Sequence, residues 1–421
     1  MTEGQAVAEE VPPGYKRTEA GAVPEGWEIG RLGDIASIRN QKILPSNVDP
    51  DTLCVELEHI GQGNGQLLEV SIAQNSTSSK YCFFTGDVLF GRLRSYLRKF
   101  WHADRDGICT TEIWPLMVNT SLVDSVFLYA IVQSNQFVET ASISYGTHMP
   151  RADWNVMKNL EVHLPPLPEQ RAIAGALSDA DGLIGALDAL IEKKRAIKRA
   201  AMQQLLTGKT RLPGFEGEWK VKRLGEIGHF AKGRGIKRDD VTDEGSPCIR
   251  YGELYTRYHN YITTPVSRIP PAVAQTALPI QTGDLLFAGS GETAEDIGRC
   301  VAYLGDEQAY AGGDIVVLAP SGQNSIYLGY LMDHPLVTAQ KARLSQGDVI
   351  VHISATNLAQ VEINLPPIDE QRAIAAVLSD MDAGIAALKR RRDKTNQIKQ
   401  GMMQELLTGR TRLIDPPEAP A

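Results

Sequence analysis

The sequence LPPLPEQR (Leu164–Arg171) occurs a second time, almost unchanged, as LPPIDEQR (Leu365–Arg372). The two copies lie 201 residues apart, and each begins a longer repeat. Just over half of the positions in Leu164–Leu212 are identical to their counterparts in Leu365–Leu413, and no gap is needed. A long internal repeat sets the architecture of a chain. Here it indicates two similar halves, each a globular segment followed by a long helix.

Each copy continues into a pattern typical of a long helix. Proline is compatible with a helix only near the first turn, where Glu169 and Glu370 also supply favourable negative charge. Apolar residues then recur at alternating steps of four and three, and each run ends at a glycine, Gly208 or Gly409. A helix of about 39 residues would be ~58 Å long, which favours a spacer over a core element. The apolar seam consists of Ile173, Leu177, Ala180, Ile184, Leu187 and Ile191 in the first copy, and of Ile374, Leu378, Met381, Ile385 and Leu388 in the second.

Polar residues and glycines interrupt this seam. Lys194 and Lys198 occupy seam positions in the first copy, as do Arg392, Thr395 and Lys399 in the second. A glycine inside a helix costs roughly 1 kcal/mol relative to alanine. Two explanations remain open: small residues allow the helices to approach closely, or another subunit or DNA meets the helices where the seam is polar. The glycines concerned are Gly175, Gly182, Gly185, Gly384 and Gly401.

The composition is that of a globular chain. Of the 421 residues 43% are hydrophobic, but no apolar run reaches the ~20 residues that a membrane helix needs. The five cysteines form no CxxC pair, which fits reduced thiols and a cytoplasmic location, and the eight histidines show no metal-ligand spacing. A net charge of −8 argues against nucleic acid, because DNA binders usually carry a basic footprint. That total, however, hides local basic clusters.

The repeat also predicts where the chain divides. Trp27 and Arg31–Ile35, at the start of the first globular segment, are echoed by Trp219 and Arg223–Ile227 in the second. The predicted segments are a flexible N-terminal arm (1–22), a first globular domain (23–163), a central repeat with its spacer helix (164–212), a second globular domain (213–364), a C-terminal repeat with its spacer helix (365–413) and a flexible tail (414–421).

Strands and helices mix irregularly in both globular domains, so the expected fold class is α/β, or mixed α+β. Thr85–Phe90 and Thr282–Phe287 carry the same signal of a turn followed by a strand. Between such shared signals the two domains differ greatly. Two binding modules that read different targets would show this combination of common elements and changed loops. Among the expected elements are strands at Leu53–Leu57, Val88–Phe90 and Ile108–Val118, and helices near Ser125–Thr140 and Ser325–Ala342.

Clusters of cations and aromatic residues make DNA the predicted ligand of these loops. Gly91–Phe100 holds four cations plus aromatic residues, whereas a solvated loop is the plainer alternative. Arginine can pair with guanine or phosphate through two hydrogen bonds, and tyrosine can stack or donate a hydrogen bond. In the second half, Ala288–Thr293 is small and polar, and Lys232–Arg238 and Ile249–Tyr255 add cations and hydroxyls. The candidate residues in these clusters are Arg92, Arg94, Ser95, Tyr96, Arg98, Lys99, Lys232, Arg234, Lys237, Arg250, Tyr251, Glu253, Tyr255, Ser290 and Glu292.

Two strings imitate enzyme motifs. Phe287–Gly291 has the FxGxG shape of an S-adenosylmethionine loop, but the equivalent stretch Phe90–Arg92 lacks it and no catalytic motif accompanies it. Gly208–Thr210 looks like the end of a phosphate-binding loop, but the glycine required five positions earlier is Gln203. We therefore interpret Gly208 as a helix stop and keep a self-contained methyltransferase only as an alternative.

Together these features resemble the specificity (S) subunit of type I restriction–modification enzymes. The resemblance covers nearly the whole chain and rests on three doubled motifs: LPPxxEQRAIA, LLTG[K/R]TRL and GD[V/L]LF. It implies two pseudo-twofold-related target recognition domains, each reading one half of a bipartite double-stranded DNA site. Two long antiparallel coiled-coil helices would join them and set the unread spacer. On this resemblance the first DNA face is lined by Arg92, Arg94, Tyr96, Arg98, Lys99, His148 and Arg151, and the second by Lys232, Arg234, Tyr251, Ser290, Glu292 and His352.

The resemblance further implies that the chain itself has no catalysis and no cofactor. It would recruit two methyltransferase subunits, which use S-adenosylmethionine, and through them restriction (translocase/nuclease) subunits, which depend on ATP and Mg. Besides the self-contained methyltransferase, one alternative is a coiled-coil scaffold that joins partners without reading bases. A scaffold would be indifferent to salt and sequence. A DNA reader would lose affinity with salt, with a log–log slope of about −0.9 per phosphate neutralised.

Overall fold

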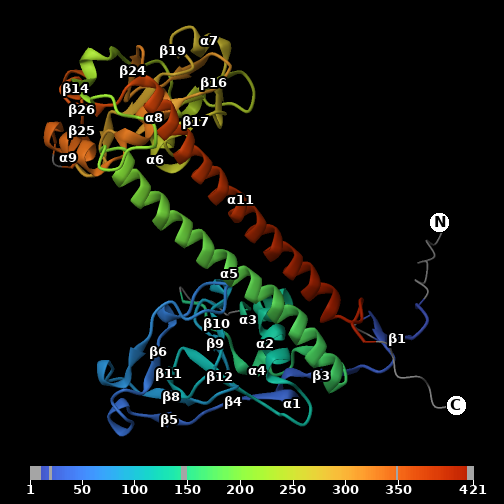
Figure 1. Ribbon diagram of the computed structural model, residues 1–421. Coiled ribbons are helices and arrows are strands. Elements are labelled where there is room, and N and C mark those ends of the chain that lie inside the picture. The colour runs from blue at the N-terminus through green and yellow to red at the C-terminus, as the bar shows by residue number, and fades with distance from the viewer. Residues whose placement is uncertain (1–10, 19–20, 144–148, 348, 415–421) are drawn as a thin grey trace, which may run out of the picture. The chain divides into compact units, whose positions relative to one another are not determined.

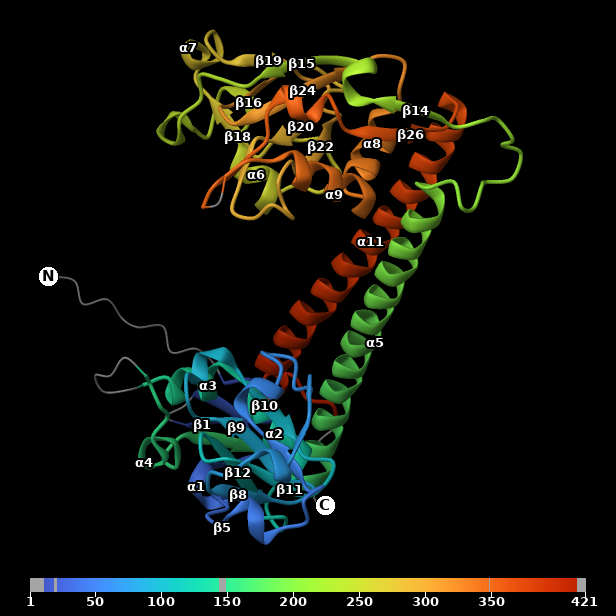
Figure 2. The ribbon, with the colours of Figure 1, turned by 90° about the vertical axis from the view of Figure 1, so that its left-hand side faces the viewer.

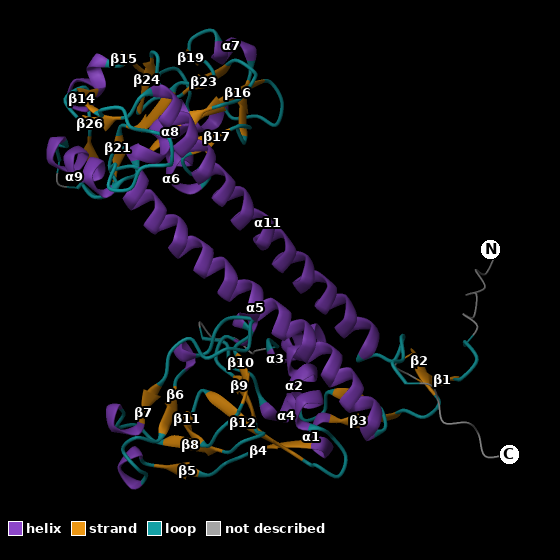
Figure 3. Cartoon of the chain, in the orientation of Figure 1, coloured by secondary structure: helices purple, strands orange, loops and turns teal. Residues whose placement is uncertain are grey.

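The computed structural model describes residues 11–18, 21–143, 149–347 and 349–414 (Figure 1). It contains two compact units, Met1–Asp188 with Arg390–Ala421 in the first and Ala189–Lys389 in the second. Each unit combines one mixed domain of strands and helices with the ends of both long helices (Figure 3). These units are defined by contacts in space, whereas the six predicted segments follow the repeat. The predicted segment boundaries stay a prediction.

The two long helices are present at the predicted length. Helix α5 spans Leu167–Leu205 and α11 spans Ile368–Leu406, 39 residues each. At the start of α5 the Gln170 side chain donates to Pro165 O (2.8 Å) and accepts from Asp124 N (2.9 Å). Beyond the ends of the helices, Gly208 and Gly409 have φ values of 70° and 74°. That left-handed backbone suits glycine and stops a helix, as the sequence pattern predicted.

Ion pairs show that the helices run antiparallel within each unit. In the first unit, Lys399 Nζ on α11 lies 2.6 Å from Asp181 Oδ1 on α5, and Arg392 pairs with Asp188 at 3.2 Å. In the second unit, Lys198 on α5 pairs with Asp382 on α11 at 2.6 Å. Higher numbers on one helix therefore meet lower numbers on the other. The cations that interrupt the apolar seam are bound by carboxylates of the opposite helix, except Lys194, which is exposed.

Close helix approach does not explain most of the helical glycines. Apart from the backbone of its own helix, a Cβ atom placed on Gly175, Gly182, Gly384 or Gly401 would have no neighbour within 4 Å, and one on Gly185 would meet the end of the Gln66 side chain at 3.2 Å. The apolar seam itself packs as expected. Ile173 and Leu177 join the core of the first unit, and Ile374 and Leu378 join that of the second.

The first domain is built on two sheets. One is antiparallel, in the order β10-β9-β12-β4, and the other is mixed, in the order β5-β8-β11-β6-β7, with β11 and β6 parallel. Two pairs, β1-β2 and β13-β3, complete its strands within the described residues. The strands are β1 Tyr15–Thr18, β2 Gly21–Pro24, β3 Glu28–Arg31, β4 Ala36–Ile38, β5 Lys42–Ile43, β6 Leu53–Val55, β7 Ser71–Ile72, β8 Lys80–Phe83, β9 Val88–Gly91, β10 Phe100–His102, β11 Gly107–Thr110, β12 Ile113–Val118 and β13 Glu161–Leu164. The helices are α1 Leu32–Ile35, α2 Ser125–Gln133, α3 Asn135–Ala141 and α4 Trp154–Met157.

The second domain repeats this plan. Its sheets have the orders β15-β24-β20-β22-β17 and β18-β16-β23-β19, and its strand pairs are β14-β26 and β21-β25 (Figure 2). The strands are β14 Lys220–Arg223, β15 Gly228–Lys232, β16 Ser246–Ile249, β17 Tyr261–Ile262, β18 Ser267–Ile269, β19 Leu278–Ile280, β20 Leu285–Ala288, β21 Ser290–Gly291, β22 Cys300–Tyr303, β23 Ala309–Ala311, β24 Ile315–Pro320, β25 Val351–His352 and β26 Glu362–Leu365. The helices are α6 Tyr251–Thr256, α7 Pro271–Ala274, α8 Ser325–Met332, α9 Pro335–Leu344 and α10 Ala355–Leu358.

Three predicted elements are each divided in two. The strand expected at Ile108–Val118 turns at Thr111-Glu112, and its parts β11 and β12 belong to different sheets. The helix expected near Ser125–Thr140 breaks at Ser134, whose Oγ accepts from Phe137 N and so caps α3. The helix expected near Ser325–Ala342 breaks before Pro335, which cannot supply an N–H to a continuous helix.

Buried carboxylates anchor the start of each long helix. Glu169 accepts from the Trp27 indole N–H (3.0 Å) and from the Arg412 guanidinium (2.7 Å). Glu370 accepts in the same way from Trp219 (3.1 Å) and Arg211 (2.6 Å). In both units the motif that follows the helix-stopping glycine therefore folds back onto the start of the other long helix. In the described part of the chain, no helix is both long and apolar enough to cross a membrane.

Candidate nucleic-acid interface

In the first domain the fold brings two of the predicted DNA-contacting segments together. After β9 the basic loop forms a short 3₁₀ turn at Ser95–Leu97, flanked by Arg94 and Arg98 with φ values of 52° and 51°. The loop lies against the segment before α4, because Arg94 N donates to Pro150 O (2.9 Å) and Leu93 forms a β-bridge with Arg151. His148 lies outside the described residues.

The side chains of this loop have different surroundings. Arg94 and Tyr96 are exposed, and 55% of the surface of Tyr96 is accessible to solvent. Ser95 is buried and donates to Ala141 O at 2.9 Å. Lys99 Nζ donates to Leu57 O at 2.6 Å. Among the predicted contacts of this loop, Arg94 and Tyr96 are exposed, whereas Arg92, Arg98 and Lys99 are partly buried.

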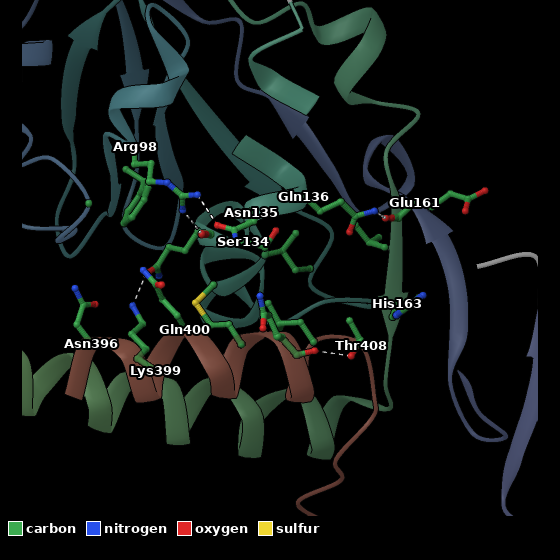
Figure 4. A pocket seen from close by; sticks show the side chains of 18 of the residues that line it. Arg98, Ser134, Asn135, Gln136, Glu161, His163, Asn396, Lys399, Gln400 and Thr408 are labelled. Carbon is green, nitrogen blue, oxygen red and sulfur yellow. Dashed lines mark hydrogen bonds between the residues drawn. The ribbon is translucent and has the colours of Figure 1, made fainter. Parts of the chain in front are cut away.

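Arg98 is directed into a cavity instead of outward. Its guanidinium donates to Gln133 O (3.1 Å) and to Asn135 Oδ1 (2.5 Å). The cavity, of about 340 Å³, lies within the first unit between the α2–α3 junction, β13 and the last turns of α11 (Figure 4). Its wall also carries Lys399, which donates to Gln133 Oε1. This geometry gives Arg98 a structural role beneath the loop.

Two further arginines are supported by neighbouring side chains. The Arg92 guanidinium lies over the Trp114 ring, 5.5 Å from its centroid. Arg151 forms a two-nitrogen ion pair with Glu112, with Nε 3.0 Å from Oε2 and Nη2 2.9 Å from Oε1. This pairing raises the pKa of the already cationic Arg151. Because Nε and Nη2 bind the carboxylate, the other edge of the guanidinium faces away from it.

The second domain builds its loops on the same backbone arrangement. Ser290 on β21 pairs with His352 on β25, as Leu93 pairs with Arg151 in the first domain. Ile353 N donates to Gly289 O at 2.9 Å, which matches the bond of 2.9 Å from Ala152 N to Arg92 O. The shared backbone thus carries unrelated side chains at the equivalent positions.

Hydrogen bonds connect the candidate residues around β21. Ser290 is buried, and its Oγ lies 2.9 Å from Nδ1 of the exposed His352. Tyr255 donates its hydroxyl to Ser290 O at 3.0 Å, and burial raises the pKa of Tyr255 to about 12, so the phenol stays protonated at neutral pH. Glu292, in the turn after β21, is exposed.

The remaining candidates of the second domain surround Gly312–Asp314. Lys232 is exposed at the end of β15, and Arg234 and Lys237 are exposed on the loop that follows it. Arg234 N donates to Ala311 O at 3.2 Å. Arg250 and Tyr251 open α6 beside them, and Glu253 is buried under Arg250. The fold therefore collects three stretches that are far apart in sequence.

Charged residues that the sequence analysis missed also belong to these clusters. Glu112 was placed inside a predicted strand, although the polar run Thr110–Glu112 between apolar residues was a signal of the turn. Its counterpart Asp314 has a φ of 59° and accepts from Gly289 N through its backbone. Arg238 and Arg257 line the same cavity as Arg250.

The enzyme-like strings have other structures. Phe287–Gly291 consists of the end of β20, Gly289 and the whole of β21, and a bend and a turn follow it, whereas an S-adenosylmethionine loop leads into a helix. Gly208 follows the end of α5. Within the described residues, no group of three or more His, Cys, Asp or Glu side chains could hold a metal ion.

A comparison with known families decides the affiliation of the chain. The family model for the type I restriction modification DNA specificity domain matches residues 24–194 and again 216–400. The chain belongs to this family. The two matches are the two specificity domains, and they coincide with the two halves that the internal repeat predicted. The likeness to the S subunits of type I restriction–modification enzymes is thereby confirmed.

Curated relatives can be aligned with most of the chain or with part of it. The type I restriction enzyme MjaVIII specificity subunit of Methanocaldococcus jannaschii is 24% identical over 430 residues, covering 95% of this chain and 96% of the relative. The type I restriction enzyme EcoDI specificity subunit of Escherichia coli is 29% identical over 163 residues, covering 38% of this chain and 36% of the relative.

Solved structures share the fold. A chain from a study of complex assembly and conformational transition in a type I R-M system has a TM-score of 0.58 and 22% identity, covering 92% of this chain and 99% of its own length. A type I restriction–modification S subunit from M. genitalium has a TM-score of 0.59 and 17% identity, covering 90% and 96%. The predicted fold class of two mixed α/β domains with long antiparallel helices is confirmed.

Proposed function

We propose that this chain is the DNA-reading subunit of a type I restriction–modification complex, and that each specificity domain reads one half of a bipartite DNA site. The two long helices hold the domains and determine the length of the unread spacer between the half-sites. The chain recognises DNA without performing the chemistry.

The observation that carries this proposal is the shared backbone with unrelated side chains. Both domains place one loop after the strand β9 or β20 against the segment before α4 or α10. The first domain presents Arg94, Tyr96 and Arg151 at this place, and the second presents His352 and a cavity lined by cationic side chains. Hydrogen-bond donors and acceptors at the ends of such loops read base edges, while cations bind phosphates. Two different sets on one scaffold suit two different half-sites.

The proposal includes partners that supply the chemistry. Two methyltransferase subunits, using S-adenosylmethionine, would dock on the chain, and restriction (translocase/nuclease) subunits, depending on ATP and Mg, would join through them. The relatives named above are specificity subunits of type I restriction enzymes, which supports this assignment.

A genome-wide map of methylated adenines tests the proposal. Cells would carry the neighbouring methyltransferase with or without this chain. We expect a split motif that appears only with the chain, and that motif would give both half-sites and the spacer. Methylation without any chain-dependent motif, despite stable binding of the methyltransferase, would contradict DNA reading and favour a scaffold.

A further inference from the structure

In the second domain Arg250 is held in one orientation by a buried carboxylate. Its Nε lies 2.8 Å and its Nη2 2.7 Å from Oε1 of Glu253, and its backbone N–H donates to Oε2 at 3.2 Å. The Arg250 side chain is 34% exposed, whereas that of Glu253 is 6% exposed. The guanidinium is therefore bound on its inner edge and open to solvent on the other.

The Glu253 carboxylate is itself held in place by a hydrogen bond from a neighbouring strand. Ser267 on β18 donates its hydroxyl to Glu253 Oε1 at 2.5 Å. Glu253 lies in the first turn of α6, where a negative charge is favourable. A carboxylate with these partners has little freedom to move. It therefore holds the arginine ready for a planar ligand and lowers the entropy that binding would cost.

Arg250 opens onto a concave, cation-rich surface. A cavity of about 920 Å³ lies between the start of α6, the loop after β15 and the turn at Gly312–Asp314. A Cβ atom on Gly313 would meet nothing within 4 Å, so the backbone there is bare and a ligand can approach it closely. The cavity is lined by the cations Lys237, Arg238, Arg250 and Arg257 and by the aromatic ring of Tyr251.

Helix α6 connects the residues of this cavity with those around β21. Arg250 and Tyr251 stand at one end of this helix, and Tyr255 at its other end donates to Ser290 O beside His352. The bond from Tyr255 therefore joins the helix that carries Arg250 to the strand pair that carries His352.

We propose that Arg250 reads a guanine in the half-site of the second specificity domain, and that Glu253 is its positioning residue. This inference rests on the proposed function. An arginine pairs with guanine O6 and N7 through two parallel N–H donors, and its free edge supplies them. The exposed Lys237, without a carboxylate to orient it, contacts phosphate instead. Glu253, although it was a predicted DNA contact, acts through Arg250.

A panel of duplexes tests these roles. The complete complex with the methyltransferase would be titrated with duplexes that carry the mapped site, each with one base pair of the second half-site replaced. For Arg250→Lys we expect the preference for one G·C pair to fall by about ten- to a hundredfold, with other positions unchanged. Lysine keeps the charge but lacks the two-donor edge. Lys237→Ala is the matched control, and it should weaken all duplexes alike.

The positioning role has its own measurement. Glu253→Gln keeps the shape of the side chain but removes the charge that orients Arg250. It should therefore reduce the preference for the same G·C pair. In the Arg250→Lys background it should add no further loss, because the two residues act as one unit. Thermal melting would establish that each variant is folded. If Glu253→Gln does not fold, the Arg250→Lys profile alone decides the proposal.

The outcomes separate this inference from the proposed function. Equal weakening of every duplex by Arg250→Lys would make Arg250 a phosphate contact and overturn the inference. So would unchanged discrimination. A wild-type complex without preference among the duplexes would overturn the proposed function as well.

Discussion

Arg94 and Arg98 share a left-handed backbone conformation but differ in what their side chains reach. Both flank the 3₁₀ turn of the basic loop, with φ values of 52° and 51°. Arg94 is exposed, whereas Arg98 donates inward to Gln133 O and Asn135 Oδ1. One loop thus contains an arginine available to DNA and an arginine that supports the loop.

We predict that Arg94→Ala weakens recognition of the first half-site only. Loss of a two-donor contact to a base costs about 1–3 kcal/mol of discrimination at one base pair. The measurement is binding to duplexes altered in one half-site at a time. Arg94→Gly is the matched control for the backbone, since glycine tolerates the positive φ. Both variants should lose the same amount of base discrimination in the first half-site. Equal weakening of binding to all sequences would show instead that Arg94 contacts a phosphate.

The same comparison predicts the effect of Arg98→Ala. This variant should lower stability by about 1 kcal/mol, because the part-buried Gln133 O loses a charged donor, whereas water can replace the bond to the exposed Asn135 Oδ1. The base preference of the folded protein should be unchanged. Thermal melting and the duplex panel measure the two effects separately. A reduced base preference in the first half-site, together with an unchanged melting temperature, would show that Arg98 contacts DNA after all.

Only part of this site was predictable from the residues. The density of cations in the loop identified Arg94 and Tyr96 as candidates. It did not separate them from Arg98 and Lys99, because the acceptors Gln133 O and Leu57 O are brought near only by the fold. A local sequence pattern carries no information about such long-range partners.

At the scale of elements, the ion pairs between α5 and α11 specify how the helices align. Lys399 is buried in the first unit and bonds to both Asp181 and Gln133. Its counterpart Lys198 bonds to Asp382 in the second. A polar pair in an otherwise apolar seam is satisfied in one register and leaves an unpaired charge in others.

We predict that Lys399→Met destabilises the first unit by on the order of 2–3 kcal/mol. The value lies below that for a fully buried pair because the Asp181 side chain is 34% exposed. Urea unfolding measures it. Adding Asp181→Leu should recover part of the loss, since no unpaired carboxylate then remains. If Asp181→Leu instead lowers the free energy of unfolding further, by as much as it does alone, the two residues are not coupled.

The long helices could be predicted because their signals are local. An apolar seam, first-turn acids and a terminal glycine determine a helix without knowledge of its partners. The breaks at Ser134 and Pro335 have local signals, the polar run Gln133–Gln136 and the proline itself, but apolar helical stretches on both sides of each break were interpreted as one helix. The strand expected at Ile108–Val118 was wrong because two buried strands in succession lack the alternation typical of a strand, and the polar run Thr110–Glu112 between them was not interpreted as a turn.

At the scale of the whole molecule, acid should destabilise the fold. His102 and His163 in the first unit, and His259 and His334 in the second, have pKa values lowered from 6.5, in each case mainly by burial. The unfolded chain therefore binds more protons than the folded one just below pH 6.5, so stability rises with pH through that window. Asp284 and Asp333, whose pKa values burial raises from 3.8, act in the opposite direction above pH 3.8.

We predict a lower urea midpoint at pH 5.5 than at pH 7.5. His102→Asn removes one of the four contributions and should make the difference smaller. An equal or larger difference in this variant would show that His102 does not contribute to the pH dependence.

On the proposed function, the two helices also offer a way to change the distance between the half-sites. The boundary between the compact units crosses α5 after Asp188 and α11 after Lys389, which are equivalent positions of the repeat. One heptad inserted at both places leaves the contacts within each unit unchanged and keeps the seam on the same face. Seven residues add ~10.5 Å of helix, about three base pairs at ~3.4 Å each.

We therefore predict that the doubly extended chain methylates the same two half-sites with a spacer about three base pairs longer. Methylome mapping reads the spacer directly. Insertion into α5 alone is the control: it shifts one helix against the other, so the Asp181–Lys399 and Lys198–Asp382 pairs cannot both form, and specific methylation should be lost. A doubly extended chain that keeps the original spacer would show that contacts outside the helices determine the distance.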